Sequence, residues 1–419
     1  MSNAAQVLEV TGQVLAEWAT RIDGPVAIRL KQALLPAEES GIIFPPTYAD
    51  VGYNIDTLSD GTRVAIVDSV GSQANRLEPI FKSESDDPKR WLVPQINIVI
   101  RQEACGECES CKANIGDQKR AQRECKYKRA VTRSLLDLAH RAADAVVQSS
   151  PGLLKLIAPA FKRLQQGDAG PLCTVAPTSL IFGVWDSRGD TGEKRPRLVR
   201  SVIRAWDVEP LHAAAQFNSV WKLLDEEQQD ELKKEAKSRK AKLSEKGLAD
   251  APGVFRPKVK MQKYVDGAPN PEARVLGGVL VKGRIEREVL VNLVALRALR
   301  GASDEETTKI REYLLGLSLM AATADIELFL REGCLLRYAE DSDRWYQVPR
   351  RGEPTPLSLS RAVIEQYTTA AAEYFRSNWP TVFGDKWNDG RPKLGYEFDL
   401  GAAKKLLAKK TAEEEPQEE

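Results

Sequence analysis

The stretch Val64-Ala65-Ile66-Val67-Asp68-Ser69-Val70-Gly71-Ser72-Gln73-Ala74-Asn75-Arg76-Leu77-Glu78-Pro79 joins a short β-branched run directly to a polar loop. The run predicts a buried strand, and Ser72 is the expected cap of a helical turn from Gln73 to Leu77. Such a junction attracts phosphates through backbone N–H groups and the helix dipole. An ordinary capped connection explains these residues equally well. The polar side chains gathered here are Ser69, Ser72, Gln73, Asn75 and Arg76.

Length and composition exclude several classes of protein. A chain of 419 residues predicts two domains, or one domain with large insertions. Its 61 Lys and Arg residues nearly cancel its 60 Asp and Glu residues, so only local clusters of charge could indicate a nucleic-acid partner. No apolar run approaches the roughly 18 residues of a membrane span, and residues 1–4 lack a signal-sequence pattern. We expect a cytoplasmic protein with no membrane partner and with reduced thiols.

Strands and helices mix along the chain without strict alternation, which predicts an α+β fold with a mostly antiparallel sheet. Beyond the strand at 63–70, further strands are expected at 95–100, 178–186, 197–208 and 275–282.

Helices are predicted between these strands. A helix is expected where Val131, Leu135, Leu138, Ala142 and Val146 would share one face. Helical spacing also runs from Leu290 to Arg300, and a capping box of Ser303 and Glu306 begins a further helix. Residues 222–246 predict a charged, solvated helix.

Four cysteines form the strongest local motif. Cys105, Cys108, Cys111 and Cys125 are spaced C-x2-C-x2-C-x13-C, and four thiolates at such spacing can enclose a tetrahedral zinc ion. The spacing also fits an iron–sulfur cluster in part, and cysteines that bind nothing are a third interpretation. Zinc is our expectation, as a structural and not a catalytic ion. Because the segment has almost no apolar residues, metal binding would have to fold it.

A basic stretch lies between Ser187 and Arg204. In its strand, period-two geometry places Arg200, Val202, Arg204 and Trp206 on one face and Val199, Ile203 and Ala205 on the other. One face suits a core, and the other suits a phosphate backbone with an aromatic ring beside it. A solvated β-hairpin with arginines on its wet side is the alternative. The basic residues are Arg188, Lys194, Arg195, Arg197, Arg200 and Arg204, against Asp190 and Glu193.

Catalytic motifs are absent from the sequence. It contains no P-loop, HExxH, nucleophile elbow or kinase set. Its two histidines, His140 and His212, lie near no paired carboxylate or nucleophile, so general acid–base catalysis has few candidates. Asp68 is the one carboxylate beside the polar loop, and we expect it to orient that loop through backbone hydrogen bonds. The chain is therefore not expected to be an enzyme.

Three segments together resemble the large backbone subunit of type I-G (formerly I-U) CRISPR surveillance complexes, the Cascade complexes. They are Asp68–Glu78, Ser179–Ser187 with the following Lys194–Arg197, and the Gly277-Gly278 strand that leads into Leu293–Leu299. The resemblance covers residues 40 to 340 in the same order. The cysteine cluster is not part of it.

The resemblance implies a repeat-associated (RAMP) protein with a modified RNA-recognition-motif (RRM-like, ferredoxin-like) palm, helical fingers insertions and a β-hairpin thumb. Residues 1–60 would be an N-terminal lead-in, and 61–340 the palm with its insertions. A C-terminal helical region would follow at 341–400, and a helix end with a disordered acidic tail at 401–419. The insertions would be a Cys-rich segment at 101–128, the thumb hairpin at 186–200 and a charged helical segment at 211–250.

The function implied is that of a non-catalytic subunit in antiviral defence. Several copies would polymerise along one guide RNA (crRNA), bind its phosphate backbone without sequence preference and present it to target DNA. The partners would be the guide, the target DNA, copies of the chain itself, a fused processing/cap subunit and a large subunit. The expected RNA-binding residues are Ser69, Ser72, Gln73, Asn75, Arg76, Lys194, Arg195, Arg197, Arg200, Arg204, Gly277 and Gly278.

Two alternatives belong to other classes of function. One is a RAMP-type endoribonuclease that cuts bound RNA with Asp68. The other is a stand-alone, zinc-containing RNA-binding protein.

Overall fold

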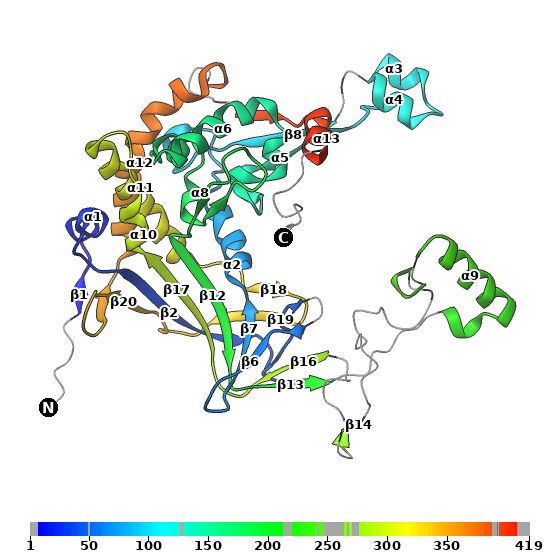
Figure 1. Ribbon diagram of the computed structural model, residues 1–419, viewed down its shortest axis with the longest axis horizontal. Coiled ribbons are helices and arrows are strands. Elements are labelled where there is room, and N and C mark those ends of the chain that lie inside the picture. Colours follow the sequence, from blue (N-terminus) through cyan, green and yellow to red (C-terminus); the bar gives the residue numbers. More distant parts are fainter. Residues whose placement is uncertain are drawn as a thin grey trace, which may run out of the picture.

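A large sheet, helices on one side of it and two projecting arms make up the molecule (Figure 1). The structure is a computed structural model, and it describes residues 7–48, 51–125, 127, 129–212, 220–241, 243–246, 248, 264–265, 268–269, 276–387, 392 and 394–408. The acidic tail expected at the C-terminus lies outside the described residues.

The large sheet is mixed. Among its described strands, the edge pair of β1 with β21 is parallel and the other pairs are antiparallel. From edge to edge the strands are β1 (Leu8–Glu9), β21 (Thr355–Ser358), β20 (Arg344–Val348), β2 (Ala27–Pro36), β17 (Ile285–Asn292), β12 (Val199–Trp206), β7 (Arg63–Asp68) and β6 (Ile55–Thr57). A hairpin of β18 (Phe329–Arg331) and β19 (Cys334–Tyr338) joins the sheet at β2.

Strand directions follow from these pairings. β2 and β12 both pair antiparallel with β17, so they point the same way. β17 and β20 both pair antiparallel with β2, so they also share a direction. Residues 27–36 fall within the predicted N-terminal lead-in, and they form β2, a central strand of this sheet. The expected α+β class is confirmed.

Helices cover one face of the sheet. Alternate residues of β17 are buried on this face, namely Ile285, Arg287, Val289 and Val291. The covering helices pack into one apolar core with Val289 and Val291, whereas Ile285 belongs to a second apolar cluster with residues of the β18–β19 hairpin. The covering helices are α1 (Gly12–Thr20), α2 (Val70–Leu77), α10 (Leu293–Ala298) and α11 (Asp304–Ala322), with α6 (Pro151–Gln165), α7 (Gly170–Val175), α8 (Pro177–Ile181) and α12 (Arg361–Phe383) behind them.

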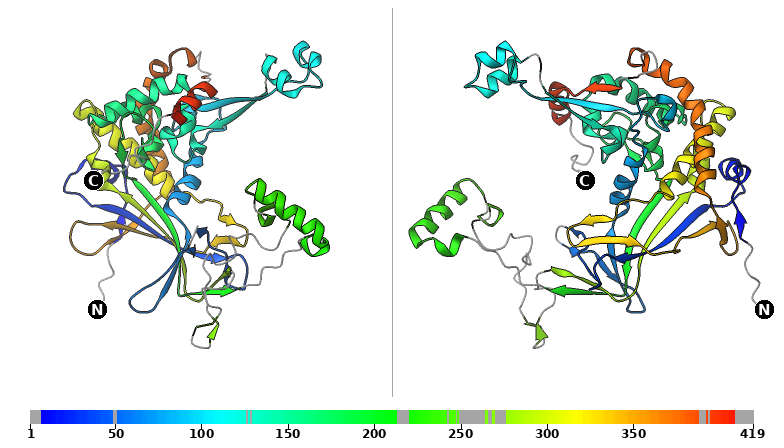
Figure 2. Two further views of the ribbon diagram at one scale, coloured as in Figure 1. Left: turned by 45° about the vertical axis from the view of Figure 1, so that its right-hand side comes forward. Right: turned by 180° about the vertical axis from the view of Figure 1, so that it is seen from behind.

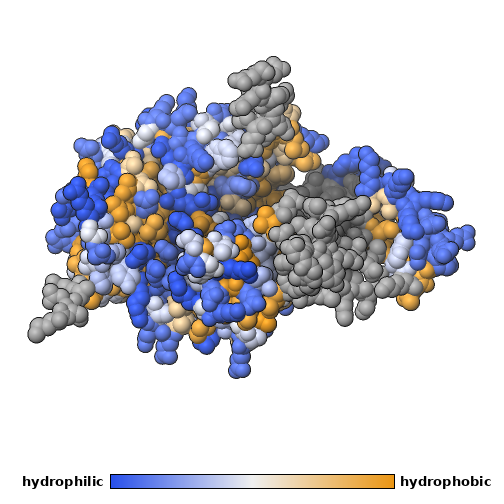
Figure 3. Space-filling model, turned by 60° about the horizontal axis from the view of Figure 1, so that its bottom comes forward, coloured by the Kyte–Doolittle hydropathy of each residue, from blue (hydrophilic) through white to orange (hydrophobic). Residues whose placement is uncertain are grey.

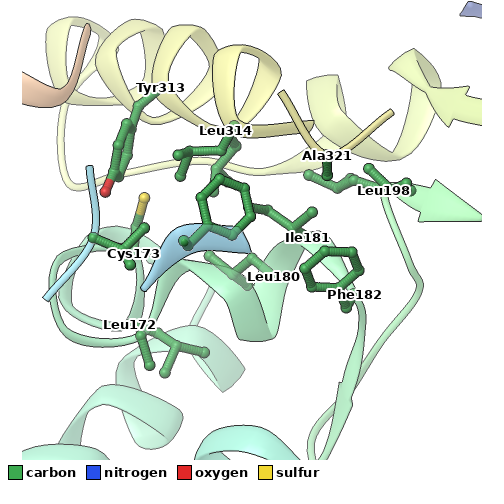
Figure 4. Close-up of a cluster of buried hydrophobic side chains, with 14 of the residues drawn as sticks. Leu172, Cys173, Leu180, Ile181, Phe182, Leu198, Tyr313, Leu314 and Ala321 are labelled. Atoms are coloured by element: carbon green, nitrogen blue, oxygen red, sulfur yellow. The ribbon is translucent and has the colours of Figure 1, made fainter. Parts of the chain in front are cut away.

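The strand predicted over 178–186 is wrong. Residues 177–181 form α8, which begins with Pro177 at its first position. Leu180, Ile181 and Phe182 are all buried, and they point into a cluster with Leu314 of α11 (Figure 4). A fully buried apolar run has no periodicity that separates a helix from a strand, whereas proline at the first turn favours a helix.

The single helix predicted from Val131 to Val146 is also wrong. Val131 lies in β9 (Arg129–Ser134), and short helical turns follow, the last being α5 (Ala145–Gln148). The side chains of Ser134 and Asp144 accept hydrogen bonds from backbone N–H groups two residues ahead, which begins a new turn each time. Arg141 between them has a left-handed φ of 55°. Local capping therefore interrupts the apolar spacing.

Other predicted elements are confirmed, with shifted ends. The strands at 63–70, 197–208 and 275–282 are β7, β12 and β16 (Leu276–Val281), and that at 95–100 is β8 (Asn97–Glu103). Ser303 caps α11, accepting a hydrogen bond from the Glu306 N–H. The Glu306 carboxylate accepts from Ala302 N–H instead of closing the box on Ser303. Leu290–Asn292 belongs to β17, and α10 follows it.

Two arms leave the body (Figure 2). The first is the β8–β9 ribbon, with α3 (Glu109–Ala113) and α4 (Gln118–Glu124) at its tip and β22 (Gly395–Glu397) beside its base. The second extends the β12–β17 pair as β13 (Val208–His212) and β16, where His212 pairs with Leu276, and β3 (Ile42–Ile43) joins them.

The chain between β13 and β16 includes α9 (Glu226–Ser238), a helix with no buried residue. Hydrophilic side chains cover it in Figure 3, as expected for the charged segment 222–246. In the described parts of the chain, no helix has the length and apolarity needed to cross a membrane. The remaining elements are β4 (Thr47–Tyr48), β5 (Gly52–Tyr53), β10 (Val184–Trp185), β11 (Lys194–Arg195), β14 (Tyr264–Val265), β15 (Ala268–Pro269) and α13 (Leu400–Ala408).

Candidate nucleic-acid interface and metal centre

Asp68 ends β7 and organises the loop after it. The residue is fully buried, and its Oδ2 accepts hydrogen bonds from Gln73 Nε2 at 2.6 Å and Arg76 Nε at 3.2 Å. Its Oδ1 lies 3.5 Å from a guanidinium nitrogen of Arg331. Asp68 thus orients the loop through side chains, where the sequence suggested backbone hydrogen bonds. The helix cap is Ser69 and not Ser72, since Ser69 Oγ accepts from the Ser72 N–H.

Arg76 and Arg331 tie the β18–β19 hairpin to this loop. Arg76 donates to the Leu330 carbonyl at 2.7 Å, and Arg331 donates to the Val67 carbonyl at 3.0 Å. About a quarter of each side chain is exposed. Most of the donor capacity of Arg76, an expected RNA contact, is therefore used within the protein.

Gln73 belongs to a buried polar chain that crosses the sheet. Its Oε1 accepts from Ser201 at 2.7 Å, and Ser201 in turn accepts from Arg287 Nε at 3.2 Å. Arg287 also donates to Gln32 at 2.7 Å, whose amide donates to Asp343 at 2.9 Å. Gln73 has no exposed surface. The side-chain amide of Gln73 therefore bonds to Asp68 and Ser201 inside the protein and does not face a ligand.

Asn75 is exposed and connects the loop to the hairpin of β10 and β11. Arg141 donates to Asn75 Oδ1 at 3.4 Å and to the Gly183 carbonyl at 3.5 Å. The same guanidinium lies 2.7 Å from the Glu78 carboxylate, and both side chains are buried. Burial raises the pKa of Glu78 to about 7, although the Arg141 charge opposes this rise. The Glu78–Arg141 ion pair therefore holds two predicted RNA-binding segments side by side.

A hairpin of β10 and β11 spans residues 184–195 and overlaps the hairpin predicted at 186–200. β10 and β11 pair over two residues each, and the turn between them rests on α6, where Gln165 donates to the Thr191 carbonyl. Arg195 donates to the Leu164 carbonyl at 2.9 Å. Lys194 is exposed and lies over the ring of Trp185, which is 48% exposed. Arg197 is exposed as well.

Arg200 and Arg204 lie on the opposite side of the sheet from α2. Their neighbours along β12 are buried on the other face, Ser201 against Gln73 of α2 and Ile203 in the apolar cluster below the β18–β19 hairpin, so the two arginines point to the uncovered face. Arg200 is exposed and Arg204 is half-buried. The predicted alternation of a core face and an arginine face in this strand is confirmed.

Gly277 and Gly278 lie in β16, away from both groups. Gly278 has a φ of 98°, and a Cβ there would approach Ile42 to 3.0 Å. Its N–H donates to the Tyr53 hydroxyl at 3.0 Å. The close approach that requires glycine at 278 is therefore made by β3 of the same chain. The predicted residues divide into a group at the start of α2, a group at the β10–β11 hairpin and just after it, a group on the uncovered face and this glycine pair.

The four cysteines come together at the tip of the first arm. Their sulfurs all lie within 4.8 Å of one another, and four of the separations are 3.3, 3.6, 3.7 and 3.8 Å. A tetrahedral ion with metal–sulfur bonds of about 2.3 Å needs sulfur separations of about 3.8 Å. The site therefore matches one ion. A four-iron cluster, in which each cysteine binds a different iron atom, needs sulfurs further apart.

The chain around Cys105 favours a thiolate. Gly106 has a φ of 80°, and the Cys108 N–H donates to the Cys105 sulfur at 3.4 Å. Backbone hydrogen bonds from Glu107 and Cys108 lower the pKa of Cys105 to about 6, whereas burial raises that of Cys111 to about 12. A bound cation would offset this cost, since metal ligation deprotonates a coordinating thiol. Cys105, Cys108, Cys111 and Cys125 could thus hold a zinc ion.

Several residues of these networks carry no signal that the sequence analysis used. Arg287 is the clearest case, because it occupies a buried position in the alternating pattern of β17, between Ile285 and Val289. A charged residue at a core position of a strand indicates a buried polar network, so the pattern itself contained this information. Arg141 and Arg331 act through contacts distant in sequence, and no local spacing indicates them.

Comparison with known proteins adds one finding. No curated protein matches the chain. Residues 28–210, from β2 to β13, match the family model described as CRISPR-associated protein GSU0053 (Cas_GSU0053).

Proposed function

We propose that this chain is the non-catalytic backbone subunit of a type I-G CRISPR effector complex, and that several copies assemble along one guide RNA. The family match over residues 28–210 carries the proposal. The matched part contains the Asp68 loop, the four cysteines and the arginine-bearing strand β12. A role in CRISPR defence is plausible on this match, and the finer role is our inference.

Strand order supports an RRM-like palm. Strands β20, β2, β17 and β12 lie next to one another, and β12 and β17 form a hairpin. The segments from β2 to β12 and from β17 to β20 both contain helices that cover the sheet, together with further strands, of which β6 and β7 extend the sheet beyond β12. This is the order and direction of a β-α-β-β-α-β unit. The inserted helices with the cysteine arm would be the fingers. We place the thumb at β13 and β16, because this hairpin projects from the palm, whereas β10 and β11 rest on α6.

Guide binding in this proposal involves phosphate contacts, with sequence specificity left to base pairing. Of the expected RNA-binding residues in the Asp68 loop and in the chain from β11 to β12, Asn75, Lys194 and Arg197 are exposed. The endoribonuclease alternative needs Asp68 at the RNA. A fully buried carboxylate with three side-chain partners favours a structural role instead.

The mass of the complex tests the assembly. We expect that the chain co-expressed with a guide RNA purifies as several protomers on one RNA, because each protomer binds backbone without reading sequence. Native mass spectrometry would give the ratio, with the chain expressed without guide as the control. One protomer per RNA would contradict the filament and favour the stand-alone RNA-binding protein.

The cysteine cluster is proposed as a structural zinc site. Elemental analysis should find about one zinc per chain, with loss of the metal in Cys125→Ser, because three thiolates cannot close the tetrahedron. Hydrogen exchange in residues 101–128 should rise in this variant, since few apolar residues hold the segment. Cys173→Ser is the matched control, because that thiol is buried in the main core. A brown protein with bound iron would contradict the zinc assignment.

A further inference from the structure

We infer that the uncovered face of the large sheet is a second contact surface for the guide, where RNA bases stack and phosphates meet arginines. The inference rests on the proposed function for the identity of the RNA. It is independent of the Asp68 loop, because α2 packs on the opposite face of the sheet.

Strand register places the residues of this face in rows. Arg200 of β12 pairs with Leu290 of β17, which pairs with Arg29 of β2, which pairs with Tyr346 of β20. Paired residues point to the same side of a sheet, so one row carries two arginines and one aromatic ring. Arg204 lies two positions after the buried Val202 on the same face.

Two arginine–aromatic pairs lie on this face. The Arg29 guanidinium is 5.0 Å from the centroid of the Tyr346 ring, and the Arg284 guanidinium is 4.6 Å from that of Trp206. Both residues are half-buried, so part of each is exposed to solvent. Trp206 Nε1 and Arg29 Nε are buried atoms without a hydrogen-bond partner. Aromatic rings and guanidinium planes are the groups on which unpaired bases stack.

Charge on this face suits a polyanion. Glu286 forms ion pairs with Lys31 at 3.4 Å and with Arg284 at 3.6 Å. Arg200 and Arg204 have no ion-pair partner within the described part of the chain. The basic residues of the face are Arg29, Lys31, Arg200, Arg204, Arg284, Arg337 and Arg344, and the acidic ones are Glu286, Glu288 and, at the β6 and β1 edges, Asp56 and Glu9.

Net positive charge next to stacking planes favours single-stranded nucleic acid over a protein surface. An apolar partner would leave Arg200 and Arg204 desolvated and unpaired, at a cost in free energy. RNA supplies a phosphate for each of them and bases for the rings. Binding would therefore be sequence-tolerant and dependent on salt concentration.

The test uses the full chain and a fluorescein-labelled single-stranded RNA of mixed sequence. We expect Arg200→Ala/Arg204→Ala to weaken binding about tenfold at about 0.1 M salt and to reduce the slope of log K against log salt by about 1.4, for two lost phosphate contacts. Tyr346→Ala should weaken binding about tenfold with little change of slope, because it removes stacking and no charge.

Arg361→Ala is the matched control. Arg361 is an exposed arginine at the start of α12, paired with Glu365, and its removal should leave RNA affinity unchanged. Thermal unfolding of each variant would show that the fold is retained. Guide RNA containing 4-thiouridine should crosslink to peptides with Trp206 or Tyr346.

The outcomes separate this inference from the proposed function. If the wild-type chain binds RNA, and the uncovered-face variants bind it as tightly as Arg361→Ala does, the second surface is wrong and the proposed function stands. If the wild-type chain binds no RNA, either alone or during co-expression with a guide, both are wrong.

Discussion

Replacement of Arg141 by methionine is expected to lower the free energy of unfolding by about 3–5 kcal/mol, because it leaves the buried Glu78 carboxylate without its counter-charge. The same substitution removes the hydrogen bonds from Arg141 to Asn75 and to the Gly183 carbonyl. The loop after β7 and the hairpin of β10 and β11 would then lose their connection. Urea unfolding measures the first effect, and hydrogen exchange at Asn75 measures the second.

The sign of the pH dependence follows from the raised pKa of Glu78. Burial raises this pKa from 4.5 to about 7, so the folded protein binds the proton more tightly than the unfolded chain does. The stability contributed by this proton is fully present below pH 4.5 and is lost as the pH rises through about 7. Without Arg141, ionised Glu78 raises the free energy of the folded protein further. The loss caused by Arg141→Met should therefore be larger at pH 8 than at pH 5.

A double variant provides the control. Glu78→Gln/Arg141→Met removes both charges while it keeps the volume, and we expect it to recover part of the lost stability. If Arg141→Met alone were as stable as the wild type at pH 8, the Glu78–Arg141 ion pair would not hold the two segments together.

Asp68→Ala is expected to lower the free energy of unfolding by at least about 3 kcal/mol, because Arg76 and Arg331 both lose their buried counter-charge. Gln73 also loses its acceptor at the end of the polar chain. Differential scanning calorimetry would show the change. RNA incubated with either the wild type or the variant should stay intact.

Asp68→Asn distinguishes a structural role of Asp68 from a catalytic one. Asparagine keeps one carbonyl oxygen for Gln73 or Arg76, so it should retain more stability than alanine does. A wild-type chain that cuts RNA, with cleavage lost in Asp68→Asn and stability unchanged, would establish the endoribonuclease alternative.

The sequence indicates the elements whose patterns are local. The residues of β7 form a short β-branched run, and those of β12 alternate between an arginine face and a core face. Ser303 caps α11 at the predicted residue. α8 was missed because an apolar run buried on every side has no period. β17 was missed because Arg287 stands at one of its core positions, and the charge hides the alternation.

The candidate sites also divide into one with a local sequence pattern and one whose contacts come from distant parts of the chain. Cysteine spacing is local, so the four ligands could be predicted together from the sequence. The sequence predicts the strand and the helix on either side of Asp68 and Ser69, but the side chains of this loop bond to Arg331 and Ser201, which lie far away along the chain. No spacing rule indicates such partners. For the same reason the sequence could not show that Arg76 and Arg200 lie on opposite faces of one sheet.

Because His212 pairs with Leu276, the length of the segment between these two residues can vary. The segment between these residues begins and ends at neighbouring positions of one hairpin, so its length has little effect on the entropy of closing the loop. Residues can be gained or lost there while the register of β12 and β17 stays the same. Related chains of very different length can therefore share this sheet, and a reporter domain could be inserted at this point.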